Sequence, residues 1–151
     1  MSGKIEVRPI TATDTIDIRW AILRPGLPRE TAVFPGDDSP GTQHLGVFMD
    51  DRLVGVASFY DVPLPDETVT FHPRQLRGMA TLPEVRGSGC GRALLESCHE
   101  SARRVGSALL WCNARRAAVD FYRRHGWEVC SEEFDIPTVG PHSRMRRSLR
   151  A

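Results

Sequence analysis

Apolar residues alternate with polar ones in several short segments of the chain, which is the two-residue period of half-buried β-strands. The first such segment, Ile5–Ile10, lies close to the start of the sequence. A continuous apolar run at Ala108–Cys112 instead favours a strand buried on both faces. Two runs separated by Asp50, Asp51 and Arg52 predict a hairpin. The expected strands are Ile5–Ile10, His44–Met49, Leu53–Tyr60, Gln75–Thr81, Ala108–Cys112, Trp127–Glu132 and Ser143–Leu149.

Other segments carry apolar residues at spacings of three and four, the period of an amphipathic helix. The first of these helices is expected to begin at a cap provided by Thr13 or Asp14. The other two helices are each followed closely by a glycine, Gly106 or Gly126, which is expected to end the helix. The expected helices are Asp14–Leu23, with Ile16, Trp20 and Leu23 along one side, Ala93–Arg104 and Ala117–His125.

The order of these elements predicts a mixed α+β fold built around one central sheet. A chain of 151 residues favours a single domain over residues 1–151. Loops rich in proline and glycine, Arg24–Gly41, Pro63–Pro73 and Pro137–Pro141, interrupt the pattern, and a brief helical turn is expected at Glu30–Val33. Because long loops in small domains often bind ligands, Arg24–Gly41 is a candidate binding element.

Composition and charge exclude several classes of protein. The 20 basic residues nearly balance the 19 acidic ones, so no overall attraction to nucleic acid or to an anionic membrane is expected. No apolar run approaches the roughly 18 residues of a membrane helix, and the N-terminus lacks the layout of a secretory signal. The widely spaced cysteines disfavour a zinc site and are interpreted as small apolar residues of a cytoplasmic protein: Cys90, Cys98, Cys112 and Cys130.

The segment RGSGCGR, Arg86–Arg92, is the strongest candidate for chemistry. It cannot be a P-loop, which requires a lysine, because Lys4 is the last lysine in the chain. It also fails the dinucleotide pattern G-x-G-x-x-G, because Arg92 or Leu94 occupies the third glycine position in the two registers.

A phosphate cradle explains the same segment. The free N–H groups and partial positive charge of a helix N-terminus can hold an anion. Gly87, Gly89 and Gly91 remove side chains that would keep phosphate oxygens away from these amides, and Arg86 and Arg92 add charge-assisted contacts. The segment therefore predicts a pyrophosphate site without a metal; the alternative is a glycine-rich turn kept only for close packing.

The stretch MATLPEVRGSGCGRALLE resembles the acetyl-CoA-binding motif of the GNAT superfamily of N-acetyltransferases, through Arg86-x-x-Gly89-x-Gly91 between a strand and a helix. Downstream, WCNARRAAVDFYRRHGWEV resembles the second half-site of the family. The order of elements matches from Ile5 to Leu149, so the resemblance covers nearly the whole chain.

The resemblance implies a mainly antiparallel sheet of about six to seven strands, with flanking helices and a V-shaped splay between the two central strands. The pantetheine arm of acetyl-CoA would pair with the backbone of Met79, Ala80 and Thr81, and Asn113 would contact it from the opposite side. The pyrophosphate would lie on the amides of Arg86, Gly87, Ser88, Gly89, Cys90 and Gly91, with Arg92 nearby.

The resemblance also implies direct attack of a primary amine on the thioester of acetyl-CoA. Tyr122 would be the general acid that protonates the departing CoA thiolate, whereas helical spacing alone would make it a core residue. No motif fixes the base that deprotonates the amine. The candidates in loops and at strand ends are Glu30, Asp37, Asp38, His44, Asp61 and His142.

The identity of the acceptor stays open. Arg24 and Arg29 would suit a carboxylate or phosphate, whereas the acidic residues of the same loop, Glu30, Asp37 and Asp38, would suit an ammonium group. A small molecule or a peptide amine is expected, and the family also allows a homodimer.

Two other functions were weighed. One is a non-catalytic acyl-CoA-binding or regulatory module of the same fold. The other is a nucleic-acid-binding module, which is disfavoured because its arginines are scattered over a helix and a terminal strand: Arg123, Arg124, Arg144, Arg146, Arg147 and Arg150. Neither nucleic acid nor a membrane is expected as a partner.

Overall fold

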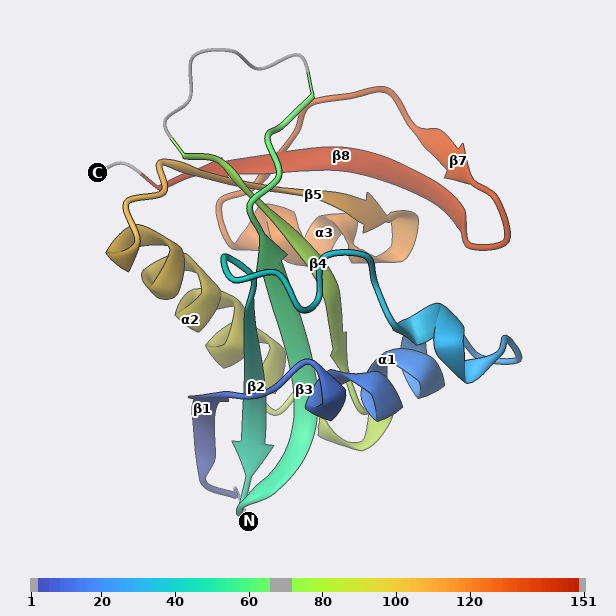
Figure 1. Cartoon of the computed structure of the whole chain (residues 1–151), viewed down its shortest axis with the longest axis vertical. Coiled ribbons are helices and arrows are strands. Elements are labelled where there is room, and N and C mark those ends of the chain that lie inside the picture. The colour runs from blue at the N-terminus through green and yellow to red at the C-terminus, as the bar shows by residue number, and fades with distance from the viewer. Residues whose placement is uncertain (1–2, 66–71, 150–151) are drawn as a thin grey trace. The chain divides into compact units, whose positions relative to one another are not determined.

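The computed structural model describes residues 3–65 and 72–149 (Figure 1). Arg150 and the middle of the expected Pro63–Pro73 loop lie outside these residues. The chain divides into two compact units, which are described separately: unit 1 comprises Met1–Tyr60 and Leu76–Ser101, and unit 2 comprises Asp61–Gln75 and Ala102–Ala151. The prediction of a single domain stays a prediction.

The strands form an eight-stranded sheet in the order β1-β2-β3-β4-β5-β8-β6, with β7 paired to β8. The pairings β1–β2, β2–β3, β5–β8, β6–β8 and β7–β8 are antiparallel, whereas β4–β5 is parallel. This confirms the mixed, mainly antiparallel sheet. The strands are β1 (Ile5–Pro9), β2 (Gln43–Met49), β3 (Arg52–Tyr60), β4 (Arg74–Thr81), β5 (Leu109–Arg115), β6 (Glu128–Val129), β7 (Phe134–Ile136) and β8 (Gly140–Ser148).

The eighth strand lies between the expected strand Trp127–Glu132 and the expected loop Pro137–Pro141. The short strand β7 pairs with the first residues of β8, Phe134 opposite His142 and Ile136 opposite Gly140. Thr138, in the intervening turn, has a φ of 67°. The Pro137–Pro141 stretch is therefore the turn of a hairpin and the first residues of β8, and β7 has only three residues, too few to show a sequence period.

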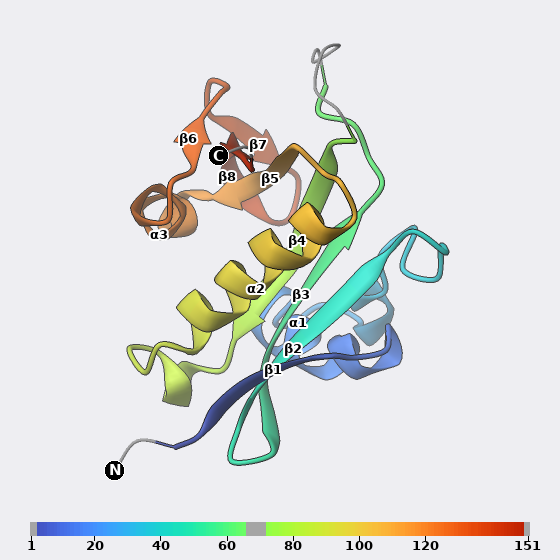
Figure 2. The ribbon, with the colours of Figure 1, turned by 90° about the vertical axis from the view of Figure 1, so that its left-hand side faces the viewer.

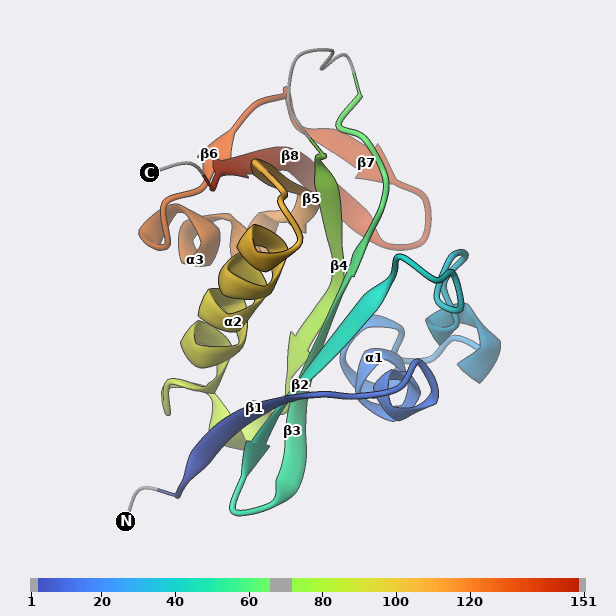
Figure 3. The same cartoon turned by 60° about the vertical axis from the view of Figure 1, so that its left-hand side comes forward.

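In unit 1, helices α1 (Ile16–Leu23) and α2 (Cys90–Arg104) cover opposite faces of the β2–β4 strands (Figures 2 and 3). On the α1 side, Ile18 packs with Val56 of β3 and Ala80 of β4. On α2, Leu94 and Leu95 are fully buried, as the helical spacing predicts. α2 begins at Cys90, inside the glycine segment.

Two expectations for the first helix were wrong. Its start is stabilised by Thr11 and Asp14, which exchange side-chain-to-amide hydrogen bonds of 3.0 and 3.2 Å, rather than by a cap at Thr13 or Asp14. Trp20 is 38% exposed and donates its indole N–H to the carbonyl of Leu27, whereas Arg19 is fully buried. The buried face of the helix is thus rotated by one residue, because Arg19 forms hydrogen bonds with buried partners in unit 1.

The central hairpin has a tighter turn than the sequence indicated. Met49 pairs directly with Arg52, so the turn consists of Asp50 and Asp51 alone. Both residues have positive φ, 49° and 67°, which is the geometry of a two-residue turn that follows the twist of the strands. The expected helical turn near Glu30 is present as a 3₁₀ helix, Arg29–Ala32.

Unit 2 contains β5–β8, the first residues of β4, and helix α3 (Val119–Arg124), which lies beside β6 (Figure 2). A 3₁₀ turn, Arg116–Ala118, replaces the first part of the expected helix. Trp111 is buried with Leu64 and Leu109, and its indole donates to the Val62 carbonyl at 2.8 Å.

The parallel ladder between β4 and β5 is two pairs long and lies within unit 2. Arg74 pairs with Leu110 and Gln75 with Trp111. A ladder this short is what the predicted splay of the two strands requires.

Candidate active site

The Arg86–Arg92 segment turns through two glycines in the left-handed region. Gly87 has a φ of 81° and Gly89 a φ of 94°, after a 3₁₀ turn at Pro83–Val85. A Cβ on Gly87 would have no atom within 4 Å, and one on Gly89 would meet only Ile5 Cδ1 at 4.0 Å. These two glycines are therefore required by backbone conformation, and close packing does not explain them.

Several amides of this segment lack an acceptor. The first bond of α2 runs from the Ala93 amide to the Gly89 carbonyl at 3.0 Å. Turn bonds occupy the amides of Arg86 and Ser88, each at 3.2 Å from its acceptor. Within the described part of the chain, no acceptor lies on the amides of Gly87, Gly89, Cys90, Gly91 and Arg92.

The side chains of the segment differ in their availability. Arg86 is exposed and forms no ion pair with a described residue. Arg92 is paired with Glu96 one turn along α2, at 3.1 Å. Cys90 is only 1% exposed, so its side chain fills space as expected. Net positive charge and free amides thus meet at the start of α2.

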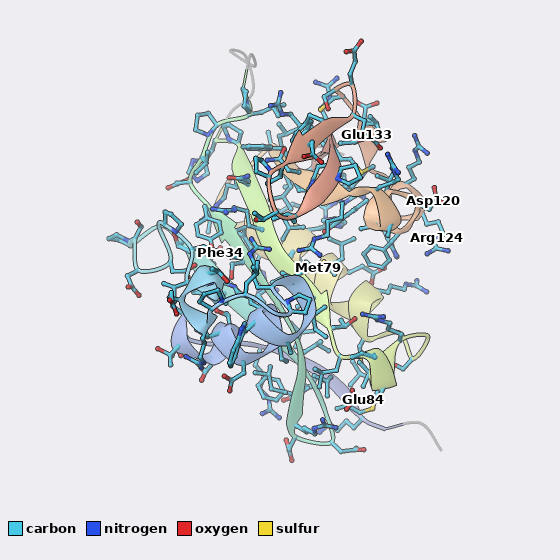
Figure 4. The ribbon with its side chains drawn as sticks, turned by 90° about the vertical axis from the view of Figure 1, so that its right-hand side faces the viewer. Phe34, Met79, Glu84, Asp120, Arg124 and Glu133 are labelled. Atoms are coloured by element: carbon cyan, nitrogen blue, oxygen red, sulfur yellow. The ribbon has the colours of Figure 1, made fainter. Side chains whose placement is uncertain are left out.

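The strand before this segment contains an irregularity that the sequence did not indicate. Gly78, within β4, has a φ of 66°, and a Cβ there would lie 2.9 Å from Phe34 Cε2. Phe34 therefore lies beside the residue that precedes Met79, and both are marked in Figure 4. Of the predicted arm-binding residues, Ala80 is buried and Met79 and Thr81 are half-buried.

Two predicted site residues belong to unit 2. Asn113 lies on β5 opposite Arg144, and its side-chain oxygen Oδ1 is buried without a hydrogen-bond partner in the described residues. Tyr122, on α3, is 7% exposed, and its ring packs against Trp127 with centroids 5.0 Å apart. The Tyr122 carbonyl accepts hydrogen bonds from the amides of His125 and Trp127, and these bonds fix the end of the helix.

A buried ion pair anchors the Arg24–Gly41 loop of unit 1. The guanidinium of Arg19 donates to both carboxylate oxygens of Asp37, at 2.7 and 3.0 Å, and to the carbonyl of Ala32 at 3.0 Å. It also donates to Ser58 Oγ at 2.9 Å and to the Tyr60 hydroxyl at 3.1 Å. The bidentate pair holds the loop against α1 and β3.

The electrostatics of this network keep Asp37 ionised. Burial alone would raise the pKa of Asp37, but hydrogen bonds from Arg19, Tyr60 and the Phe34 amide together hold it below its usual value. Burial and the neighbouring Asp37 carboxylate raise the pKa of Tyr60 to about 12. Asp37 is a structural anion here and is a poor proton acceptor.

Histidine 44 completes the same network. Nε2 of His44 donates to the Asp37 carbonyl at 2.9 Å, because that oxygen can only accept. Nδ1 lies 2.6 Å from Ser58 Oγ, so both ring nitrogens of His44 are engaged in hydrogen bonds.

The remaining base candidates are therefore four. Glu30, Asp38 and Asp61 are exposed. His142 donates Nδ1–H to the Gly140 carbonyl at 2.7 Å, so Nε2 is the ring nitrogen that could act as a base.

Arginines proposed for nucleic-acid binding are engaged within unit 2. Arg123 pairs with Asp120 at 3.7 Å, and Arg146 pairs with Glu128 at 2.8 Å. Arg147 donates to the His125 carbonyl. Arg124 and Asp120 project from the outer surface of α3 in Figure 4. These contacts are typical of a solvated protein face.

The hydrogen-bond network of Asp37, in which Arg19 and Tyr60 bind its carboxylate and Ser58 binds Arg19, was not predicted from the sequence. A signal was present: Thr15, Ile18, Arg19 and Ile22 share one helical face, so a charge there requires a buried partner. Gly78 gave no such signal, because its conformation depends on how Phe34 packs.

Comparison with known proteins decides the family. The family model described as an acetyltransferase (GNAT) domain matches residues 32–145, more than half of the chain. The chain belongs to the GNAT acetyltransferase family. The prediction of an N-acetyltransferase is thereby confirmed at the level of the family.

Relatives of this GNAT chain agree. The Bacillus subtilis (strain 168) protein named "Uncharacterized N-acetyltransferase YitI" is 38% identical over 148 residues, which are 97% of each chain. The Escherichia coli ribosomal-protein-S18-alanine N-acetyltransferase has a TM-score of 0.75 at 18% identity, over 98% of this chain and 96% of that one. An aminoglycoside 6'-N-acetyltransferase solved with coenzyme A has a TM-score of 0.74 at 11% identity, over 97% and 98%. The two solved structures show the fold alone.

Two further observations concern membrane-spanning helices and metal ligands among the described residues. No helix there is long and apolar enough to cross a membrane. Nor do three or more His, Cys, Asp or Glu side chains gather there as metal ligands.

Proposed function

We propose that the protein transfers the acetyl group of acetyl-CoA to a primary amine, by direct attack of the amine on the thioester. The observation that carries this proposal is the set of amides without acceptors at Gly87 and at Gly89 through Arg92. Amides at a helix N-terminus bind phosphate oxygens. In a GNAT chain, the pyrophosphate of CoA is the anion that suits them, with Arg86 as a further donor.

Asn113 fits the same cosubstrate. A buried carbonyl oxygen without a donor costs free energy, about 1–3 kcal/mol in proteins. The Oδ1 of Asn113 is such an atom. The pantetheine arm carries amide N–H groups, and a hydrogen bond from one of them would satisfy it. The backbone of Met79, Ala80 and Thr81 is proposed to pair with the same arm.

Tyr122 is proposed as the general acid. The amine must be neutral when it forms the C–N bond, and its nitrogen then gives up one proton to a base or to water. Collapse of the addition product breaks the C–S bond. The electron pair of that bond leaves on sulfur, which takes the phenolic proton of Tyr122. Packing of Tyr122 against Trp127 holds the ring in one position on α3. No covalent enzyme intermediate is required.

The decisive experiment measures thiol release from acetyl-CoA against a panel of amines. Tyr122→Phe removes the acid and is expected to lower kcat about tenfold or more, the range that general acids supply. Tyr60→Phe is the matched control, because it removes the only other phenol of the chain. That variant should lose stability through the Asp37 network while retaining kcat.

Equal turnover by Tyr122→Phe and the parent protein would refute the role of Tyr122. Tight binding of acetyl-CoA without thiol release for any amine, including peptide N-termini and protein lysines, would instead favour the non-catalytic acyl-CoA-binding module.

A further inference from the structure

Three guanidinium groups surround one aromatic ring in unit 1. The Cζ atoms of Arg19, Arg77 and Arg24 lie 4.1, 4.7 and 5.3 Å from the centroid of the Phe34 ring. Arg77 also lies 5.6 Å from the Tyr60 ring centroid. Like charges gathered around one ring repel one another, and an anion among them would reduce the repulsion.

The Asp37 carboxylate is not available to Arg77. Asp37 is committed to Arg19 by two hydrogen bonds. Arg77, on β4, makes no hydrogen bond or ion pair with any described residue, and its contacts are the two aromatic rings. Its side chain is half-buried, so water screens this charge less than it would at a fully exposed site.

A stacked guanidinium remains a good anion ligand. The contact with Phe34 uses the face of the group, whereas its N–H donors point outward in its own plane. That fork matches the two oxygens of a carboxylate or phosphate. Arg77 is therefore held by aromatic packing in a position where its donors are available.

The neighbouring sequence relates this position to the reaction. Arg77 precedes Met79 by two residues on β4, with Gly78 in its left-handed conformation between them. If Met79 binds the pantetheine arm as proposed, an anion on Arg77 lies a few bonds from that arm. A small acceptor carrying both an amine and an anionic group spans this separation.

We infer that Arg77 binds the carboxylate or phosphate group of the amine acceptor. The inference rests on the proposed function and names its substrate class. The contacts of the Arg24–Gly41 loop remove one residue from each of its two opposed predictions. Asp37 is sequestered by Arg19 and cannot receive an ammonium group, and Arg29 is paired with Asp17 at 2.6 Å.

The test compares acceptors that differ only in the anionic group. β-Alanine is measured against β-alaninamide, and O-phosphoethanolamine against ethanolamine, in thiol-release assays with acetyl-CoA. We expect the parent protein to prefer one or both anionic members in kcat/KM. Arg77→Met should lower that preference roughly 10- to 100-fold, as expected for a charge-assisted hydrogen bond. The two pairs separate a carboxylate acceptor from a phosphate acceptor.

Arg29→Met is the matched control. Arg29 lies 5.9 Å from the Trp20 ring and is also stacked, but it has its own carboxylate partner. Its loss should leave the preference unchanged. Arg77→Lys keeps the charge and should retain part of the preference. Thermal unfolding and acetyl-CoA titration of each variant separate loss of the anion contact from loss of folding.

Each outcome decides the inference. Thiol release without preference for the anionic members, or with a preference that Arg77→Met leaves intact, would overturn it while the proposed function stands. If no amine releases thiol, the proposed function fails in this assay. Calorimetric titration with the same four compounds then decides: binding of an anionic member that Arg77→Met abolishes supports the inference, and absence of such binding overturns it.

Discussion

Two segments of unit 1 look alike in sequence and differ in how their polar groups are satisfied. Arg24–Gly41 and Arg86–Arg92 both combine glycines with arginines. In the first, Asp37 closes a network in which the Arg19 guanidinium makes five hydrogen bonds. In the second, five amides have no acceptor in the described residues. Internally satisfied polar groups stabilise a fold, whereas donors left without partners indicate where a ligand binds.

The largest effect is expected from breaking the satisfied network. Arg19→Met leaves Asp37 buried without its counter-ion and should lower the free energy of unfolding by about 3–5 kcal/mol. Denaturant unfolding measures this loss. Arg19→Met combined with Asp37→Leu should recover part of it, because no uncompensated charge remains. A single variant as stable as the parent protein would show that the pair has no role in anchoring the loop.

A pair of glycine substitutions compares the packed region with the open one. Gly78→Ala places a Cβ 2.9 Å from Phe34 at a φ of 66°. It should cost about 2–4 kcal/mol, from the left-handed conformation together with overpacking. Gly87→Ala has the conformational cost alone, about 1–2 kcal/mol, because its Cβ meets nothing within 4 Å. Equal losses in the two variants would contradict the role of packing at Gly78.

The affinity for acetyl-CoA directly tests the Arg86–Arg92 segment, in which five amides have no acceptor among the described residues. Arg86 is exposed and has no ion-pair partner among the described residues, so its donors are available to a phosphate. Arg86→Ala should weaken acetyl-CoA binding roughly tenfold to a hundredfold, measured by calorimetry at low salt. Arg29→Ala, from the other segment, serves as the control and should leave the affinity unchanged. Unaltered binding by Arg86→Ala would remove Arg86 from the proposed site.

Acid should weaken the hydrogen-bond network around Asp37. Hydrogen bonds from Arg19, Tyr60 and the Phe34 amide outweigh burial and depress the pKa of Asp37 in the folded state. Such a group stabilises the fold fully above its unfolded pKa, near 3.9, and that contribution is lost as the pH falls through the folded pKa. The parent protein should therefore lose stability below about pH 4 more steeply than the Arg19→Met/Asp37→Leu variant. Parallel curves would contradict this assignment.

Sequence periods predicted the fold well where one face of an element is buried. The strands β1 to β5 and β8 and the helix α2 lie close to their predicted bounds, because alternation and helical spacing record burial directly. The pattern failed at α1, where Arg19 is buried and Trp20 is exposed. A buried charge is stable only through partners distant in sequence, and no local period reports those partners.

The candidate site was less fully predictable. Its glycine motif was evident from spacing, and Asn113 and Tyr122 followed from a family resemblance. Arg77 was not recognised, since only the packing of Phe34 and Tyr60 around its guanidinium distinguishes it from any strand arginine. Nor could the sequence show that His44 binds Ser58 and the Asp37 carbonyl, or that Arg19 binds the Asp37 carboxylate, contacts that remove both residues from the candidate bases.

The smallest expected effect concerns the one arginine of the helix start that already has a partner. Arg92 is paired with Glu96 at 3.1 Å, and both side chains are exposed, so the pair contributes about 0.2–1 kcal/mol. Glu96→Gln releases Arg92 and removes a negative charge near the proposed pyrophosphate site. Acetyl-CoA should then bind up to about fivefold more tightly, an advantage that salt reduces because exposed charges are screened. Glu100→Gln, one turn further along α2, is the control for a general change in charge. Weaker binding by Glu96→Gln would mean that Glu96 positions Arg92 for the phosphate. The Arg92–Glu96 pair would then be an internally satisfied contact, like the Arg19–Asp37 pair, and not a competitor of the ligand.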